Sequence, residues 1–147
     1  MSTTYQRETV TQVLDEIKPL LMKHWEEIAH FKAVPLDPDY DAYLRAEAQG
    51  KLRVFTARKD GALVGYAVFF MGNLHYRSAR IATQDILFLL PECRGFTGYR
   101  LIRFSDSQLK AEGVEVTYHH VKVAHDFGPL LVHMGYAPVD IIYARRH

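Results

Sequence analysis

Residues 91–104 read PECRGFTGYRLIRF, and this stretch decides the fold that the sequence predicts. It follows residues 86–90, ILFLL, an unbroken apolar run typical of a buried strand, and it leads into a helical pattern. Arg94, Gly95 and Gly98 lie at the junction, although a plain strand-to-helix turn needs one glycine at most. Helix N-termini have unpaired N–H groups and the positive end of the helix dipole. The junction therefore predicts a place where the backbone approaches an anion such as a pyrophosphate.

Two better-known phosphate-binding turns do not fit this stretch. A P-loop needs Gly-Lys-Ser/Thr, which the sequence lacks, and the dinucleotide-binding fingerprint needs three glycines in an early strand–helix–strand unit. A tight loop that needs glycine for its geometry alone remains the alternative interpretation.

The segments around the junction change from helical to strand-like and then alternate. Residues 10–31 repeat apolar side chains at helical steps, and Pro19 is expected to kink or restart that helix. Asp60-Gly61 predicts a hairpin, and Gly113 is expected to end the helix after the junction. The expected elements are a weak strand at 4–10, helices at 10–31 and 40–49, strands at 52–58, 62–72 and 79–90, a helix at 98–112, a strand at 114–123, a short helix at 126–135 and a last strand at 136–146. This order predicts an α/β (α+β) fold, in which a mixed sheet carries helices on both faces.

Composition narrows the classes of protein that the chain can belong to. Its 147 residues predict a single domain spanning residues 1–147. A net charge of +1 gives no electrostatic support for binding to nucleic acid or to an anionic membrane. The longest apolar run, residues 62–71, is too short to span a bilayer, and the polar N-terminus does not resemble a secretion signal. The only cysteine, Cys93, is expected to be a loop residue, and the expected location is the cytoplasm.

On these residues the chain resembles the GNAT acyltransferases, which transfer an acyl group, usually acetyl, from a coenzyme A thioester to an amine. Residues 91–95 are similar to the Pro-Glu-x-Arg-Gly that often precedes the family signature, and residues 133–136, HMGY, resemble the Leu-Gly-Phe/Tyr after the family's last helix. The resemblance covers residues 50–147 and implies a GNAT-like, mostly antiparallel sheet. Gly98 lies one residue late for the first signature glycine, and Tyr99 takes the place of the second. This variant form is similar to small GNAT-like proteins encoded by bacteriophages.

The resemblance implies an acetyl-CoA site on this junction. In the family, the strand before the signature splays from the next strand, and the pantetheine arm lies in the gap. The pyrophosphate then binds the amides that follow. The implied cofactor-binding residues are Leu87, Phe88, Leu89, Leu90, Arg94, Gly95, Phe96, Thr97, Gly98 and Tyr99.

Asp85 is the candidate catalytic residue, because the family often has an acidic general base on this strand. A carboxylate inside a sheet is usually paired or functional, so a structural hydrogen-bonding role for Asp85 remains open. Gln84 is expected to face the other side of the sheet. The family's usual acid, a tyrosine in the last helix, is replaced here by Leu131. The remaining candidate acids are Tyr136, Tyr143, His119, His120 and His125.

Glu27, His75 and Tyr76 are the candidate acceptor-binding residues, because the family places its first two helices over the acceptor side. Glu27 lies one helical turn from His24, for which a solvated helix face is the simpler interpretation, and no metal site is expected. Asp37, Asp39 and Asp41 would give the acceptor site an acidic rim suited to a cation.

The resulting hypothesis is an N-acetyltransferase in which the amine of a small molecule or protein attacks acetyl-CoA directly, assisted by a carboxylate. A non-catalytic GNAT-fold protein that contacts a host or partner macromolecule is the alternative. Assembly as a homodimer stays open.

Overall fold

The centre of the molecule is a five-stranded sheet in the order β1-β2-β3-β4-β5. The computed structural model describes residues 2–147. The strands are β1 (Thr3–Glu8), β2 (Leu52–Lys59), β3 (Ala62–Met71), β4 (Ile81–Leu89) and β5 (Val116–Tyr118), and the helices are α1 (Val10–Ile28), α2 (Tyr40–Ala48), α3 (Phe96–Ala111) and α4 (Gly128–His133), with a 3₁₀ turn at Pro91–Cys93. The first four strands pair antiparallel, and β4 pairs with β5 in parallel. The mixed, mostly antiparallel sheet is therefore confirmed, and the weak strand pattern at the N-terminus is β1.

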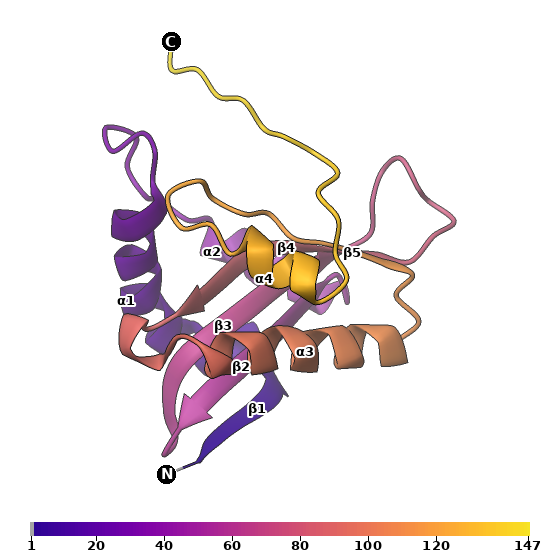
Figure 1. Ribbon diagram of the computed structural model, residues 1–147, viewed down its shortest axis with the longest axis horizontal. Coiled ribbons are helices and arrows are strands. Elements are labelled where there is room, and N and C mark those ends of the chain that lie inside the picture. Colours follow the sequence, from indigo (N-terminus) through magenta and orange to yellow (C-terminus); the bar gives the residue numbers. More distant parts are fainter. Residues whose placement is uncertain (1) are drawn as a thin grey trace.

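Helices cover both faces of the sheet, as the sequence predicts (Figure 1). On one face, α1 buries an apolar stripe that includes Val13 and Ile17 against sheet residues such as Tyr66. On the other face, α3 buries Leu101 and Leu109 against a second cluster. In Figure 1, α3 and α4 lie in front of the sheet and α2 lies behind it. No helix among residues 2–147 is both long enough and apolar enough to cross a membrane.

Helix α1 begins with a capping box and runs without a break through Pro19. The Gln12 N–H donates to Thr9 Oγ1 at 3.2 Å, and the Thr9 N–H donates to Gln12 Oε1 at 2.8 Å, which satisfies two of the free donors of the first turn. The expected restart at Pro19 does not occur. A proline removes one backbone hydrogen bond, and the buried side chains on either side of it, Ile17 and Leu20, hold the helix against the sheet.

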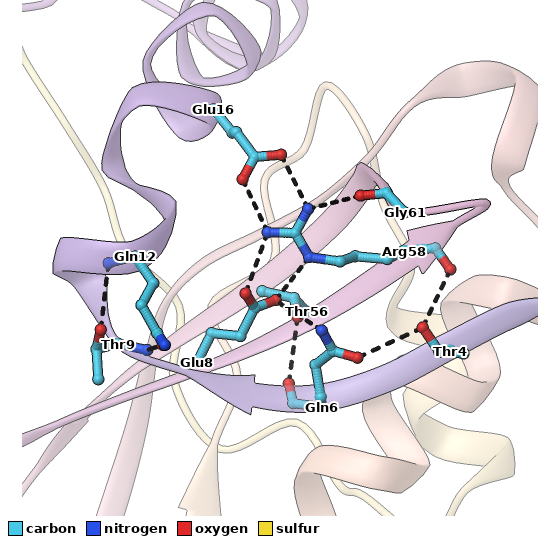
Figure 2. Close-up of polar contacts among 9 residues, drawn as sticks. All are labelled: Thr4, Gln6, Glu8, Thr9, Gln12, Glu16, Thr56, Arg58 and Gly61. Atoms are coloured by element: carbon cyan, nitrogen blue, oxygen red, sulfur yellow. Dashed lines mark hydrogen bonds and ion pairs between the residues drawn. The ribbon is translucent and has the colours of Figure 1, made fainter.

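The guanidinium of Arg58 ties β1, α1 and β2 together (Figure 2). It donates to Glu8 on β1 at 2.9 and 3.1 Å, to Glu16 on α1 at 2.9 and 2.8 Å, and to the Gly61 carbonyl in the hairpin turn at 2.9 Å. Burial alone would raise the pKa of Glu8, but the bonds from Arg58 hold it below its usual value. The same guanidinium lowers the pKa of Glu16.

Helix α3 begins two residues earlier than the sequence suggests and ends as expected. Gly113 has a φ of 87°, a left-handed conformation that favours glycine. The Gly113 N–H donates to the Lys110 carbonyl and the Val114 N–H donates to the Leu109 carbonyl, each at 3.0 Å. These two bonds form a Schellman motif, which stops the helix.

The C-terminal third departs from the expected strands. The strand expected at 114–123 is reduced to β5, and residues 136–146, expected as the last strand, have no regular structure. This final segment runs away from the rest of the molecule (Figure 1). The segment has the alternating apolar pattern of a strand, but no strand among residues 2–147 pairs with it.

Candidate active site

The strands β4 and β5 are paired over only three residues, which opens a gap in the sheet. Ile81, Ala82 and Thr83 pair with β5, whereas the rest of β4, up to Leu89, pairs with β3 alone within the described chain. The backbone edge of β4 that faces away from β3 is thus free beyond Thr83. The splay between these strands, which the resemblance implies, is confirmed.

A cavity of about 750 Å³ lies at this gap. This size falls within the range of roughly 300–1,000 Å³ typical of ligand pockets. Its walls come from the end of β4, the start of α3, the last turns of α1 and the segment around α4. The lining residues are His24, Glu27, Leu87, Phe88, Leu89, Arg94, Gly95, Phe96, Gly98, Tyr99, Ile102, His125, Phe127, Leu130 and His133. We call it the cradle cavity. It contains every residue that the sequence assigns to the cofactor except Leu90 and Thr97.

The N-terminus of α3 opens into this cavity. Gly95 precedes the helix with a φ of 98° and a ψ of −124°, a conformation that non-glycine residues rarely adopt. No side chain caps this helix end, so the N–H groups of residues 96–98 have no acceptor within the helix. A Cβ added to Gly98 would lie 3.3 Å from Leu89 Cδ1, so glycine also allows close packing there. The structure therefore provides uncapped donors and a positive helix end beside a large cavity.

Arg94 is held in place rather than free. Its Nη2 donates to both oxygens of Glu27, at 2.8 and 2.7 Å, and its Nε donates to the Leu89 carbonyl at 3.2 Å. The pair ties the last turns of α1 to the loop after β4. Glu27 compensates the charge of Arg94, so the positive character of the cavity depends on the helix end.

Three histidines line the same cavity. His24 packs on Phe88 with 5.1 Å between ring centroids, and burial lowers its pKa to about 4, so its ring is neutral near pH 7. His125 Nδ1 lies 3.7 Å from Glu27 Oε1. His133 lines the cavity from the end of α4.

A second cavity of about 470 Å³ lies beside the two preceding residues of β4, Asp85 and Ile86. We call it the acceptor cavity. It is enclosed by the last half of α1, the loop before α2, Tyr43 and two consecutive residues of β4. The lining residues are Leu21, Trp25, Phe31, Val34, Pro35, Leu36, Asp37, Pro38, Tyr43, Asp85 and Ile86. Along β4, Asp85 and Ile86 line the acceptor cavity, and the next three residues line the cradle cavity.

Asp85 is the extra residue of a β-bulge. Val68 pairs with Ile86 and Phe69 pairs with Gln84, which leaves Asp85 without a partner on β3. Its side chain is exposed in the acceptor cavity, and Tyr43 donates its hydroxyl proton to Asp85 Oδ2. Gln84 is buried on the opposite face, as expected, with its Oε1 2.9 Å from His119 Nδ1. The bulge thus aims the carboxylate away from the core and into the acceptor cavity.

The other predicted residues are dispersed. Glu27 lines the cradle cavity instead of the acceptor cavity. His75 and Tyr76 lie in the loop between β3 and β4 and line neither cavity, so their role in acceptor binding stays a prediction without support from the cavities. Asp37 alone of the expected acidic rim lines the acceptor cavity, because Asp39 caps α2 and lies 3.8 Å from Arg45.

The candidate acids lie in different parts of the molecule. His125 lines the cradle cavity, whereas the Tyr143 side chain is 88% exposed in the C-terminal segment. The Tyr136 hydroxyl donates to Asp106 at 2.6 Å, and burial, followed by this bond, raises its pKa. His119 is packed on the inner face of the sheet, where burial lowers its pKa to about 4. Leu131 is buried, so it contributes to the core.

Sequence reasoning missed Tyr43 as the partner of Asp85 and Trp25 as a wall of the acceptor cavity. Both were assigned only to inner helix faces. Their helical spacing was a correct signal for an inward direction, but spacing does not distinguish a core contact from a cavity wall.

Comparison with solved structures shows that the chain has the GNAT fold. It is 14% identical to a GCN5-related N-acetyltransferase from Ralstonia eutropha JMP134, with a TM-score of 0.76 and 99% of each chain covered. It is 16% identical to an aminoglycoside acetyltransferase from an uncultured soil metagenomic sample, with a TM-score of 0.73 and coverage of 99% of this chain and 95% of that one. It is 10% identical to an acetyltransferase from Clostridium acetobutylicum solved with acetyl-CoA, with a TM-score of 0.73 and coverage of 99% and 96%. No family model and no curated protein matches the sequence.

Proposed function

We propose that the chain is an N-acetyltransferase of the GNAT superfamily that transfers an acetyl group from acetyl-CoA to a primary amine. The observation that carries this proposal is the arrangement of two cavities along one strand. Asp85 and Ile86 line one cavity, and the residues from Leu87 to Leu89 line the other. Two substrates held there would meet beside the bulge of β4.

The cradle cavity fits coenzyme A on the chemistry of its walls. The free N–H groups at the start of α3 suit a pyrophosphate, and the free edge of β4 suits the amides of a pantetheine arm. Arg94 positions the turn through Glu27 and the Leu89 carbonyl. When bound, acetyl-CoA would supply the activated acetyl group. The structure solved with acetyl-CoA shares this fold.

Asp85 would prepare the amine. An alkylammonium is almost fully protonated near neutral pH and cannot attack until it loses a proton. Asp85 would accept that proton, directly or through a water, while Tyr43 holds one carboxylate oxygen through its hydroxyl. The neutral nitrogen could then form the bond to the acetyl carbon as the carbon–sulfur bond breaks, and the nitrogen would lose its second proton to solvent. His125 lines the cradle cavity and is the candidate to return a proton to the departing sulfur, with solvent as the alternative source.

Two measurements on the unmodified protein test this proposal. Acetyl-CoA at about a hundred times its Kd should stabilise the folded state by about 2.7 kcal/mol, which corresponds to an upward shift in Tm of roughly 5–10 °C. Release of the coenzyme A thiol should depend on an added primary amine. The absence of both effects would contradict the proposal.

A non-catalytic binding protein is the second candidate, because Leu131 is buried where the family has its acid. That candidate predicts a Tm shift with acetyl-CoA and no amine-dependent release of thiol. The phage resemblance and the cytoplasmic location stay predictions from the sequence.

A further inference from the structure

The acceptor cavity has apolar walls. Trp25 and Leu21 come from α1, Phe31 and Leu36 from the following loop, and Ile86 from β4. Prolines and a valine of the same loop complete the wall. A small ligand that fills this space must present an apolar surface, because a polar body would lose water without gaining hydrogen bonds.

Two carboxylates line the cavity and the ammonium of Lys32 lies beside it, so the carboxylates outnumber the ammonium by one, which suits a ligand with a single cation. The charged lining residues of the cavity are Asp37 and Asp85. A cation lies close by, because Lys32 Nζ sits 4.9 Å from the centroid of the Trp25 ring and donates to the Trp25 carbonyl at 3.1 Å. A polycationic ligand would place some of its ammonium groups against apolar walls or near Lys32. Both placements are unfavourable.

We infer that the natural acceptor is a monoamine whose amino group is attached to an apolar body, with the size and shape of an arylalkylamine. The ammonium would lie at Asp85, and the apolar body would lie between Trp25 and the loop of residues 31–38. This inference rests on the proposed function and names the class of its acceptor. Such an amine differs from an aminoglycoside, the compound class named for the soil metagenomic acetyltransferase of the same fold.

Trp25 makes the inference directly testable, since it is the only tryptophan of the chain. Its fluorescence therefore reports occupancy of the acceptor cavity without any need for turnover. Titration of the unmodified protein with 2-phenylethylamine should give a saturable change in Trp25 fluorescence. The concentration at half saturation should be at least about tenfold lower than the one for ethylamine or spermine. Equal or tighter binding of spermine, or no saturable change with 2-phenylethylamine, would overturn the inference.

A variant then ties binding to turnover. Trp25→Ala should raise the KM for 2-phenylethylamine by about tenfold and leave the KM for ethylamine nearly unchanged, because only the larger amine reaches the indole. Met22→Ala, an exposed position on the same helix, is the matched control. If Trp25→Ala does not fold, the fluorescence titration of the unmodified protein still tests the inference. Acetyl-CoA binding and thiol release are measured separately, so a failure of the proposed function is distinguishable from a different acceptor class.

A separate observation concerns the C-terminal segment, residues 137–147. Val139, Ile141, Ile142 and Tyr143 are 67%, 78%, 77% and 88% exposed. The first, second and last of these alternate along the chain, which is the spacing of one face of a strand. The segment projects from the molecule (Figure 1), while β5 pairs with β4 alone within residues 2–147. The chain therefore carries both an unpaired strand sequence and a free strand edge.

We propose that these two features meet between two copies of the chain, so that the C-terminal segment of each copy pairs with β5 of the other. A two-fold exchange of this kind would give every such segment a partner and would cover the edge of the sheet at β5. It would also bury the apolar side chains that one copy leaves exposed.

The mass of the protein in solution tests this exchange. Light scattering should report a dimer for the full chain and a monomer for a chain ending at Tyr136 or for the double variant Ile141→Lys, Ile142→Lys. Leu74→Lys, at an exposed position in the loop after β3, should remain a dimer. A monomeric full chain, or a dimer that survives both changes to the segment, would overturn the proposal. Amide exchange protection of residues 139–143 in a monomer would show pairing within one chain and would also overturn it.

Discussion

Gly95 and Gly98 serve different physical purposes within one turn. Gly95 is needed for its backbone, because a φ of 98° is strained for a residue with a side chain. Gly98 is needed for space, because it lies in the first turn of α3 against Leu89 and lines the cradle cavity. The sequence linked both glycines to a single role, the approach of the backbone to an anion, and could not separate the two local roles that the structure shows.

Gly98→Trp should abolish or strongly weaken coenzyme A binding while the protein still folds. The indole would fill the mouth of the cradle cavity over the free N–H groups of α3. Isothermal titration should show at least about a tenfold weaker Kd, equivalent to 1.4 kcal/mol. Ser107→Trp, an exposed position later in the same helix, should bind normally. Equal affinity of both variants for coenzyme A would show that coenzyme A does not bind in this cavity.

Asp85→Asn should bind acetyl-CoA normally and lose at least about a hundredfold in kcat/KM, the usual effect of removing a general base. The loss should shrink at high pH, where more of the amine is already neutral. Asp41→Asn, an exposed position outside the acceptor cavity, is the matched control. The competing role is a brace, because Tyr43 bonds to this carboxylate. A brace would lower the Tm of Asp85→Asn and leave turnover of the folded enzyme nearly intact.

Contacts between distant residues mark the limit of sequence reasoning at this scale. The resemblance implied that Glu27 contacts the acceptor and that Arg94 contacts the cofactor. The fold instead pairs them with each other. Asp85 was placed correctly near the junction, but its exposure depends on a bulge, which the period-two alternation of a strand does not reveal.

At the scale of elements, prediction succeeded where local chemistry was sufficient. The hairpin at Asp60-Gly61, the end of α3 at Gly113 and the helices on both faces all follow from short-range signals. Prediction failed where the structure of a segment depends on the strand that pairs with it. β5 is short because β4 splays away after Thr83, and residues 136–146 form no strand in a single chain because a strand needs a partner.

Arg58→Ala should be among the more damaging changes outside the candidate site. The variant would leave Glu8, a side chain only 13% exposed, without its ion pair and would release β1 and α1 from β2. We expect a loss of about 2–3 kcal/mol in the free energy of unfolding, measured by urea denaturation. Arg45→Ala removes an exposed pair with Asp39 and should cost less than about 0.5 kcal/mol. Similar values for the two variants would show that the Arg58 network contributes little.

At the scale of the whole molecule, two partly buried histidines couple folding to pH. His119 lies among aromatic rings, with 5.0 Å between its centroid and that of Tyr136 and 5.6 Å to that of Phe69, and its Nε2 has no hydrogen-bond partner within residues 2–147. Burial lowers the pKa of both His119 and His24 to about 4, against an ordinary value of 6.5. The unfolded chain therefore binds more protons than the folded chain between pH 6.5 and 4.

The free energy of unfolding should consequently be level above about pH 7 and fall as the pH drops from 6.5 toward 4, because acid favours the state whose histidines can be charged. A pKa lowered from 6.5 to about 4 removes about 3 kcal/mol for each histidine over this window. In urea denaturation at a series of pH values, His119→Gln should lose about 3 kcal/mol less than the unmodified protein on acidification, since glutamine has no proton to gain. Parallel curves for the unmodified protein and His119→Gln would mean that His119 is charged as easily in the folded protein as in the unfolded chain, so its contacts on the inner face of the sheet would be open to water.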